Sequence, residues 1–355
     1  MANQTVHLHE KYSKKLDQAF TLGSVVKGRL NKEEEFVGAR TVRISNINTV
    51  PLGDYNRGAT ANRYGTPTEV GDTVQELTMS QDKSFSAVID KGNNLDQCIN
   101  KAGRFMKIET EEEVIPAYDK YCLGRLAMLG GTIAGASEAI SATNVIKRMS
   151  AARQAFVNGK VPVANRTWYV NSAVFNALVE TDQFKNLDKL GTKAVAKGQV
   201  GEIFGAPVVE VPDEYLLKGV NFILVHKRAA CAPEKIWDNN LHIDPPGISG
   251  NLIEGRYYYD CFVYGHKANG IYVDVTTGSG VDVLAAPTIS ESDGAITSTG
   301  SATAWYTTDG TDPRYSATRK SGNTTGATEG MVVKAYQVEE GKFPSPVATQ
   351  TITGG

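Results

Sequence analysis

The sequence contains little that is typical of a membrane, secreted or metal-binding protein. Its most apolar stretch, 123–136, is shorter than a membrane span and includes Arg125. Residues 1–15 are polar and lack the apolar segment of a signal peptide. The cysteines form no CxxC pair and are widely spaced, at Cys98, Cys122, Cys231 and Cys261. We therefore expect reduced, buried thiols in a protein that is made and folded in a cytoplasm.

Charge of one sign is not in excess either. The chain has 37 basic and 39 acidic residues and a formal net charge of -2. No block of like charge occurs, which argues against a surface that reads nucleic-acid sequence. A container wall can still enclose nucleic acid without binding it tightly. With 355 residues, 41% of them hydrophobic, the chain is long enough for two or three domains with a substantial core.

Groups that carry catalysis or bind metal are scarce and scattered. Cys261 lies near His266 in the sequence, but no third group that would orient the pair is apparent. His242 and Asp244 have the spacing of two metal ligands, without the further ligands that a metal site needs. We therefore predict no catalytic residue, no cofactor and no metal ion.

The most informative feature is a long polar stretch, 48–73, between two segments that alternate like β-strands. It reads NTVPLGDYNRGATANRYGTPTEVGDT. Val42 and Ile44 alternate with polar residues before it, and Leu77 and Met79 do so after it. A compact domain rarely contains so long a connection with no core of its own. The pattern predicts an extended hairpin that reaches out to another molecule.

Charged and apolar residues in this stretch are candidates for contact with a neighbouring subunit, because aromatic and Arg side chains suit interface anchoring. The candidates are Leu52, Asp54, Tyr55, Arg57, Arg63, Tyr64 and Glu69. In the alternative interpretation, these side chains only keep a loop solvated. Gly65 and Gly71 are candidate hinges.

Helical spacing dominates the following part of the chain. It predicts a short amphipathic helix within 12–20, a flexible arm through 31–35, a long broken helix over 94–129 and another helix over about 143–158. Glycines within 130–135 indicate a loop.

The pattern then becomes mixed α/β. Residues 168–170 are typical of a buried strand, and Asn171 is placed as the N-cap of the next helix. Residues 200–211 indicate two short strands around a turn at Gly205. Further strands are expected at 222–225, 257–263 and 271–275.

The composition changes near Ala285, beyond which Ser, Thr and Gly dominate. Strand-like runs follow at 304–307, 331–336 and 347–352. Turn sequences separate them, including Asp309-Gly310 and Asp312-Pro313. These aspartates lack the order of a calcium-binding loop and fit tight turns better. The segment predicts a small β-sandwich appended to a finished protein.

The order of elements in 1–283 resembles the major capsid protein of tailed bacteriophages, the Hong Kong 97-type fold. The stretch 48–73 corresponds to the extended loop of that family, and 94–129 corresponds to its spine helix. WYVNSAVFNALVET and VGEIFGAPVVEVP are similar to units of its axial domain, and YYYDCFVYGHKANGIYV is similar to the return to its peripheral sheet.

The resemblance implies an α+β capsid fold, with an all-β immunoglobulin-like sandwich added at the C-terminus. The implied segments are an N-terminal arm (1–38), an extended-loop hairpin region (39–92), a peripheral domain with the spine helix (93–164), an axial domain (165–257), return strands of the peripheral domain (258–283) and the sandwich (284–355).

The C-terminal segment carries a second resemblance. WYTTDGTDPR, followed by VVKAYQVEEGKFPSPVATQTI, is similar to the immunoglobulin-like module of chitobiase-type hexosaminidases. That module is accessory, so the resemblance implies a sandwich and not glycosidase activity. Trp305, Tyr306 and Tyr315 are candidates for a glycan contact. Strand alternation places Trp305 and Tyr306 on opposite faces, so one of them is expected in the core.

The function that the resemblance implies is that of a major capsid protein in the virion of a tailed phage. Copies would assemble through hexamers and pentamers into an icosahedral head. The implied partners are other copies, portal and scaffolding proteins, double-stranded DNA as non-specific cargo, and cell-surface or mucus glycans. Some family members join subunits covalently through a Lys in the extended loop, but 48–73 contains no Lys.

Two alternatives remain open at this point. One is the encapsulating shell of a non-viral compartment, which would enclose a protein cargo. The other is a carbohydrate-active enzyme with an accessory sandwich. The missing signal peptide and the missing pair of catalytic carboxylates argue against the enzyme.

Overall fold

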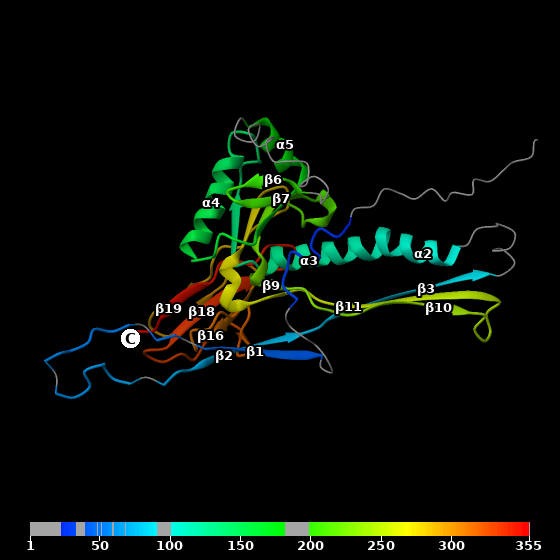
Figure 1. Ribbon diagram of the computed structural model, residues 1–355. Coiled ribbons are helices and arrows are strands. Elements are labelled where there is room, and N and C mark those ends of the chain that lie inside the picture. Colours follow the sequence, from blue (N-terminus) through cyan, green and yellow to red (C-terminus); the bar gives the residue numbers. More distant parts are fainter. Residues whose placement is uncertain are drawn as a thin grey trace, which may run out of the picture. The chain divides into compact units, whose positions relative to one another are not determined.

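The computed structural model describes most of the chain (Figure 1). Its contacts divide into two compact units. The described residues are 23–32, 40–47, 49–50, 52–58, 60–67, 69–90, 101–181 and 199–354. The first unit comprises Met1–Ser24, Gln81–Tyr118 and Ile236–Tyr258, and the second comprises Val25–Ser80, Asp119–Lys235 and Tyr259–Gly355. The predicted helix within 12–20, the predicted helix start at Asn94 and the Cys98 thiol lie outside the described residues.

The first unit packs a helix against a three-stranded sheet. The sheet has the order β10-β11-β3, from Glu234–Ile243, Gly250–Tyr259 and Gln81–Asp90. Aromatic rings connect its strands to the helix: Phe85 lies 6.1 Å from Phe105, and Trp237 lies 5.6 Å from Tyr118 and 4.9 Å from Tyr257. The sheet and the helix therefore share an aromatic core.

The predicted long helix is confirmed from residue 101 onward, and its break is a π-helical segment. The helix consists of α2 (Lys101–Glu109), η1 (Thr110–Val114) and α3 (Ile115–Leu129). The Ile115 N–H bonds to the Thr110 carbonyl, five residues earlier. Pro116 follows directly, and proline removes a backbone donor and clashes with the preceding turn. The wider π turn accommodates it without ending the helix.

The second unit is built around a six-stranded sheet of order β4-β13-β8-β5-β7-β6. Its strands are Thr132–Ala136, Ile271–Thr276, Val220–His226, Arg166–Val170, Ala206–Glu210 and Gln199–Ile203, in that order. Helices α4 (Val145–Asn158) and α5 (Ser172–Glu180) share one core with alternate residues of the strands, including Trp168 and Phe222. Both helices therefore cover the same face of this sheet.

Local signals in this unit are confirmed. The Asn171 side chain accepts a hydrogen bond from the Val174 N–H at 2.8 Å, which caps α5. Strands β6 and β7 are joined at Phe204 and Gly205, whose φ angles of 53° and 75° suit a tight hairpin turn. The predicted inward side chains of α4, such as Met149 and Phe156, are fully buried.

Three contacts join residues of different predicted segments, and the segments themselves stay a prediction. Strand β13, assigned to the peripheral return at 258–283, pairs with β4 and β8 in the six-stranded sheet. Strands β10 and β11, which fall mainly within the axial segment, pair with β3 instead. Helix α4, assigned to the peripheral segment, packs in the core with β5. Strand β3 and strand β4 are more than 130 residues away from the strands they pair with, so local pattern does not reveal these two pairings.

Of the glycines predicted to form a loop, Gly130 and Gly131 connect α3 to the next strand, but Gly135 does not lie in a loop. Residues 132–136 form strand β4, which pairs in parallel with β13. A Cβ on Gly131 would lie 2.2 Å from the Ala268 carbonyl oxygen, and one on Gly135 would lie 2.9 Å from the Thr277 side chain. Neighbouring segments of the chain therefore approach closely at Gly131 and Gly135 and leave no room for a side chain.

The second unit also contains five short elements. They are η4 (Asp213–Tyr215), η5 (Lys227–Ala229), β9 (Ala230–Cys231), β12 (Phe262–Val263) and η6 (Gly265–Gly270). Asn31, expected in a flexible arm, is buried and forms a bridge with Cys231 in β9. Residues 33–35 of that arm lie outside the described residues.

Residues 284–354, here called the C-terminal module, form two small sheets. A four-stranded sheet has the order β17-β16-β18-β19, from Lys320–Ser321, Thr303–Thr307, Val332–Val338 and Ala348–Thr351. A second sheet pairs β14 (Thr288–Ile289) with β15 (Ile296–Thr297). Ile296, Ala304, Tyr306 and Ala335 form their common core. The strands predicted in this segment are confirmed, and the immunoglobulin-like topology stays a prediction.

Candidate assembly surface

The extended hairpin predicted around 48–73 is present. Strand β1 (Thr41–Ile47) pairs antiparallel with β2 (Asp72–Thr78), in a register that runs from Thr41 opposite Thr78 to Ile47 opposite Asp72. The polar stretch continues beyond the ends of both strands as a long loop (Figure 1). The interruption in the sequence is therefore the far part of a hairpin.

The loop contains a small structure of its own. The Asn56 N–H donates to the Arg63 carbonyl at 3.0 Å, and the rings of Tyr55 and Tyr64 meet edge to face at 5.0 Å. The Gly65 N–H donates to the Asn62 carbonyl at 2.9 Å. These contacts close a turn at the tip, so the two aromatic rings present one surface.

All seven predicted contact residues are exposed. The side chain of Leu52 is 103% exposed and that of Tyr64 is 91% exposed. Sequence reasoning missed further exposed apolar residues that flank them, namely Ile47, Val50 and Val70. Ile47 ends the alternating run of β1, and this was the available signal. Apolar side chains gathered in this way are typical of a surface that another protein covers.

The base of the hairpin, in contrast, is fixed. Leu77 and Met79 are buried, and the Gln75 side chain donates to the Val263 carbonyl at 2.8 Å and accepts from the Gly265 N–H at 2.9 Å. The exposed loop is therefore attached to a buried, hydrogen-bonded root.

A buried carboxylate fixes the chain directly after the hairpin. Asp260 accepts hydrogen bonds from the Ser80 N–H at 2.7 Å, the Tyr121 hydroxyl at 2.7 Å and the Cys261 N–H at 2.7 Å. Burial, together with the nearby Asp260, raises the pKa of Tyr121 to about 12 although the Ser80 hydrogen bond acts in the opposite direction. Tyr121 therefore stays protonated and donates at neutral pH.

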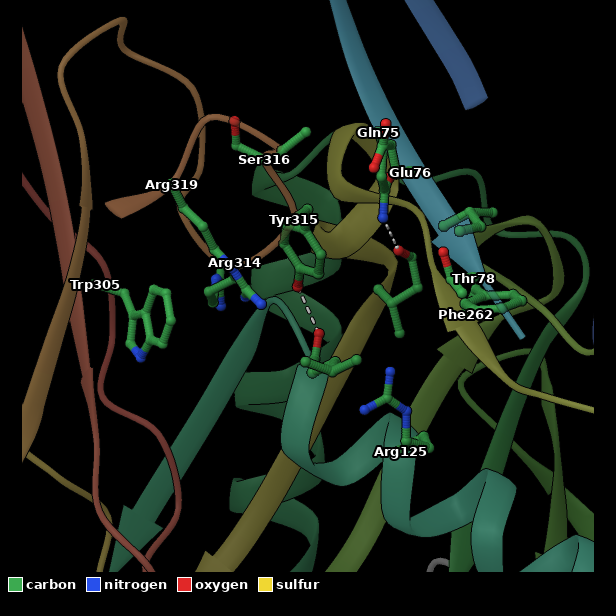
Figure 2. A pocket seen from close by; sticks show the side chains of 14 residues that line it. Gln75, Glu76, Thr78, Arg125, Phe262, Trp305, Arg314, Tyr315, Ser316 and Arg319 are labelled. Atoms are coloured by element: carbon green, nitrogen blue, oxygen red, sulfur yellow. Dashed lines mark hydrogen bonds between the residues drawn. The ribbon is translucent and has the colours of Figure 1, made fainter. Parts of the chain in front are cut away.

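A cavity of about 490 Å³ lies beside the hairpin base (Figure 2). Residues of β2, α3, β12 and the C-terminal module line it. Three guanidinium groups belong to the lining, those of Arg125, Arg314 and Arg319. The Arg319 guanidinium lies 4.8 Å from the ring centroid of Trp305, a cation–π contact.

The three rings predicted for a glycan contact lie in different surroundings, and the contact itself stays a prediction. Tyr306 is 6% exposed and belongs to the core of the C-terminal module, as strand alternation allows. The Tyr315 hydroxyl donates to the Leu129 carbonyl at 2.5 Å, so this ring contacts the rest of the second unit. Trp305 is only partly buried and lines the cavity.

The residues weighed for chemistry make structural contacts. Among the described residues, no three His, Cys, Asp or Glu side chains are grouped as a metal site requires. His242 lies 3.3 Å from Glu254, and Asp309 accepts from the Thr311 N–H within its own turn. The described cysteines Cys122, Cys231 and Cys261 are buried, as expected. In the described part of the chain, no helix has the length and apolarity of a membrane span.

Comparison with known proteins places this architecture among phage capsids. A structure from Mycobacterium phage Che8 is 22% identical to this chain, with a TM-score of 0.63, and the match covers 77% of this chain and 98% of that one. The mature capsid of bacteriophage PhiM1 is 14% identical, with a TM-score of 0.59 and coverages of 76% and 92%. The capsid of cyanophage P-SCSP1u is 13% identical, with a TM-score of 0.57 and coverages of 76% and 93%. The chain has the fold of phage capsid proteins.

The matches also define how much of the chain belongs to this capsid fold. They cover nearly all of the solved capsid chains but leave over a fifth of this chain uncovered. Residues 284–355 make up a fifth of the sequence. No protein-family model matches the chain, and neither does any curated protein.

Proposed function

We propose that this chain is the major capsid protein of a tailed bacteriophage. Residues 1–283 would form the repeating subunit of the Hong Kong 97-type shell, through hexamers and pentamers. The observation that carries the proposal is the pairing of a capsid fold with an exposed apolar loop on a fixed hairpin base. Exposed apolar side chains in this loop are unfavourable in water. Contact with a neighbouring copy would bury them and remove that unfavourable exposure.

The proposed assembly is noncovalent. No Lys occurs in 48–73, so the loop lacks the amine that covalent joining would need. Each copy contributes several modest contacts, and closed rings multiply them into a stable shell. Double-stranded DNA is the proposed cargo, which a nearly neutral wall encloses without tight binding. The virion is the proposed location, portal and scaffolding proteins are the further proposed partners, and the role is structural rather than enzymatic.

For the C-terminal module, the proposal is an immunoglobulin-like domain on the outer surface of the head. Two sheets with a common core support this assignment. The proposed glycan contact of the module involves Trp305 and Tyr315, which line one cavity, and not Tyr306, which lies in the core of the module.

Electron microscopy of the purified chain, combined with loop variants, tests the proposal. We expect closed shells from the native chain and folded, unassembled subunits from a Leu52→Asp, Tyr64→Asp double variant. Each substitution forfeits the burial of a large apolar side chain, worth about 1.5–3 kcal/mol per contact. Met331→Asp, at an exposed apolar residue of the C-terminal module, is the matched control and should still assemble.

Three outcomes separate the alternatives. Large heads of DNA-enclosing size support the phage capsid, and small shells around a protein cargo favour an encapsulating compartment. A native chain that stays monomeric under all assembly conditions contradicts both. Normal shells from the double variant would remove the loop from the assembly mechanism.

A further inference from the structure

The C-terminal module reaches the end of helix α3 through two adjacent residues. The Tyr315 hydroxyl donates to the Leu129 carbonyl at 2.5 Å, and Arg314 Nη1 donates to the carbonyls of Gly130 and Gly131 at 3.0 and 3.1 Å. Carbonyls at the end of a helix have no partner within the helix and carry its negative dipole. A hydroxyl and a guanidinium are therefore well matched to this position.

The guanidinium is held in place by its own turn. Arg314 Nη2 donates to Asp312 Oδ2 at 2.8 Å, and Nε donates to Oδ1 at 3.1 Å. The backbone N–H of Arg314 also donates to Asp312 Oδ1, at 2.9 Å. The Asp312-Pro313 turn, which the sequence indicates only as a tight turn, thus orients the two side chains that contact the helix.

Tyr315 also contacts the turn that holds the hairpin. A Cβ on Gly265 would lie 2.8 Å from the Tyr315 Cβ and 3.0 Å from its Cγ. The Cβ and Cγ atoms of Tyr315 therefore pack directly on this glycine. The Gly265 N–H is the one that donates to the Gln75 side chain in β2, and Gln75 in turn donates to Val263. The dashed lines in Figure 2 mark the hydrogen bonds of Tyr315 and of Gln75.

The connection between module and hairpin is narrow. A cavity of about 360 Å³ is lined on one side by β1 and β2, through Ile44 and Val74, and on the other by residues 309–312. Direct packing is therefore interrupted there, and the link runs through Tyr315, Gly265 and Gln75. A narrow link can be changed by a single substitution.

We infer that the C-terminal module positions the β1–β2 hairpin, with Tyr315 and Gly265 as positioning residues. The module is then a part of the assembly machinery and not only a surface addition. The effect of this positioning on assembly rests on the proposed capsid function, in which the loop contacts a neighbouring copy. Its physical content, a hairpin whose root is held by the module, is independent of assembly.

Hydrogen exchange on full-length, unassembled subunits tests the inference. We compare Tyr315→Phe, which removes only the hydroxyl, with Tyr306→Phe. Tyr306 donates to the Thr324 carbonyl at 3.0 Å inside the module, so the control loses the same kind of bond without touching the hairpin link. We expect amide exchange in 41–47 and 72–78 to rise about three- to tenfold in Tyr315→Phe, the range for one lost hydrogen bond. Exchange there should be unchanged in Tyr306→Phe.

Two further variants provide reference levels for hydrogen exchange in the hairpin. Gln75→Leu, which removes both hydrogen bonds at the hairpin root, shows the exchange expected from a loosened base. Gly265→Ala displaces the Tyr315 ring and should approach that level. Unchanged hairpin exchange in Tyr315→Phe, with a clear rise in Gln75→Leu, would overturn the inference. A chain that never assembles but shows the predicted exchange contradicts the capsid function alone, and normal assembly with unchanged exchange contradicts the positioning role alone.

Discussion

Two glycines in and after helix α3 differ in why glycine is present. At Gly131 the reason is close packing and not backbone flexibility. Gly131 donates its N–H to the Ala268 carbonyl at 3.2 Å, and that carbonyl oxygen occupies the space where a side chain would begin. Gly124, inside α3, meets only the Leu217 Cδ2 atom, at 3.8 Å. The same residue type is thus required at one position and replaceable at the other.

Alanine at these two positions should therefore have opposite effects. Gly131→Ala should lower the free energy of unfolding by about 1–3 kcal/mol, because backbone atoms must move to admit the Cβ. Gly124→Ala should be neutral or stabilising by up to about 1 kcal/mol, since alanine favours the helix. Chemical denaturation of both variants checks this. Equal effects would mean that the close approach at Gly131 relaxes without cost.

A second residue-scale feature is the carboxylate that holds the segment 25–32. Glu234 lies 2.6 Å from Lys32 and 2.9 Å from Lys27, and its side chain is largely buried. Burial raises its pKa, but the hydrogen bonds from Lys32 and Lys27 outweigh it, so the net pKa lies below 4.5. A carboxyl group whose pKa is lowered by folding stabilises the folded chain when the pH is above the pKa of the unfolded state. This stabilisation is lost as the pH falls through the pKa of the folded state.

Glu234→Gln should accordingly destabilise the subunit at pH 7 by about 1 kcal/mol. The difference from the native chain should shrink as the pH falls below the unfolded value near 4.5 and vanish once both states are protonated. Unfolding free energies measured across this range provide the test. Glu202→Gln, at an exposed acid, is the control and should show no such trend. A constant difference between pH 7 and pH 3 would contradict the ion-pair explanation.

At the scale of elements, the sequence predicts what is local and misses what is paired over distance. Helix α4, the Asn171 cap and the Gly205 turn depend on neighbouring residues, and all are confirmed. Gly135 was predicted in a loop but lies in strand β4, whose strand character comes from parallel pairing with β13, over 130 residues later. Its small residues are set by contacts with other segments, which no local pattern reveals.

The candidate site follows the same rule. Alternation around 48–73 identified the hairpin, and its polar composition identified the exposed loop. The fixed root was not predictable, because Gln75 finds its partners at Val263 and Gly265. The edge-to-face contact of Tyr55 with Tyr64 was also missed, since it requires the turn that closes the tip. The contact of this loop with a neighbouring copy stays a prediction.

At the scale of the whole molecule, the C-terminal module is part of the second compact unit although its composition sets it apart. Arg314 and Tyr315 contribute to this, because they contact carbonyls at the end of α3. A capsid fold with a freely tethered addition would leave those carbonyls to water. The module should therefore unfold together with the six-stranded sheet.

The three tryptophans allow this to be measured. Trp168 lies in the core of the six-stranded sheet, Trp305 in the module and Trp237 in the first unit. In variants that retain one tryptophan each, with phenylalanine at the other two positions, fluorescence should report the same midpoint of thermal unfolding for Trp168 and Trp305. Trp237 is the internal comparison, since the first unit can unfold at its own temperature. A Trp305 transition well below that of Trp168 would show that the module unfolds alone, and the contacts at α3 would then contribute too little to couple the two.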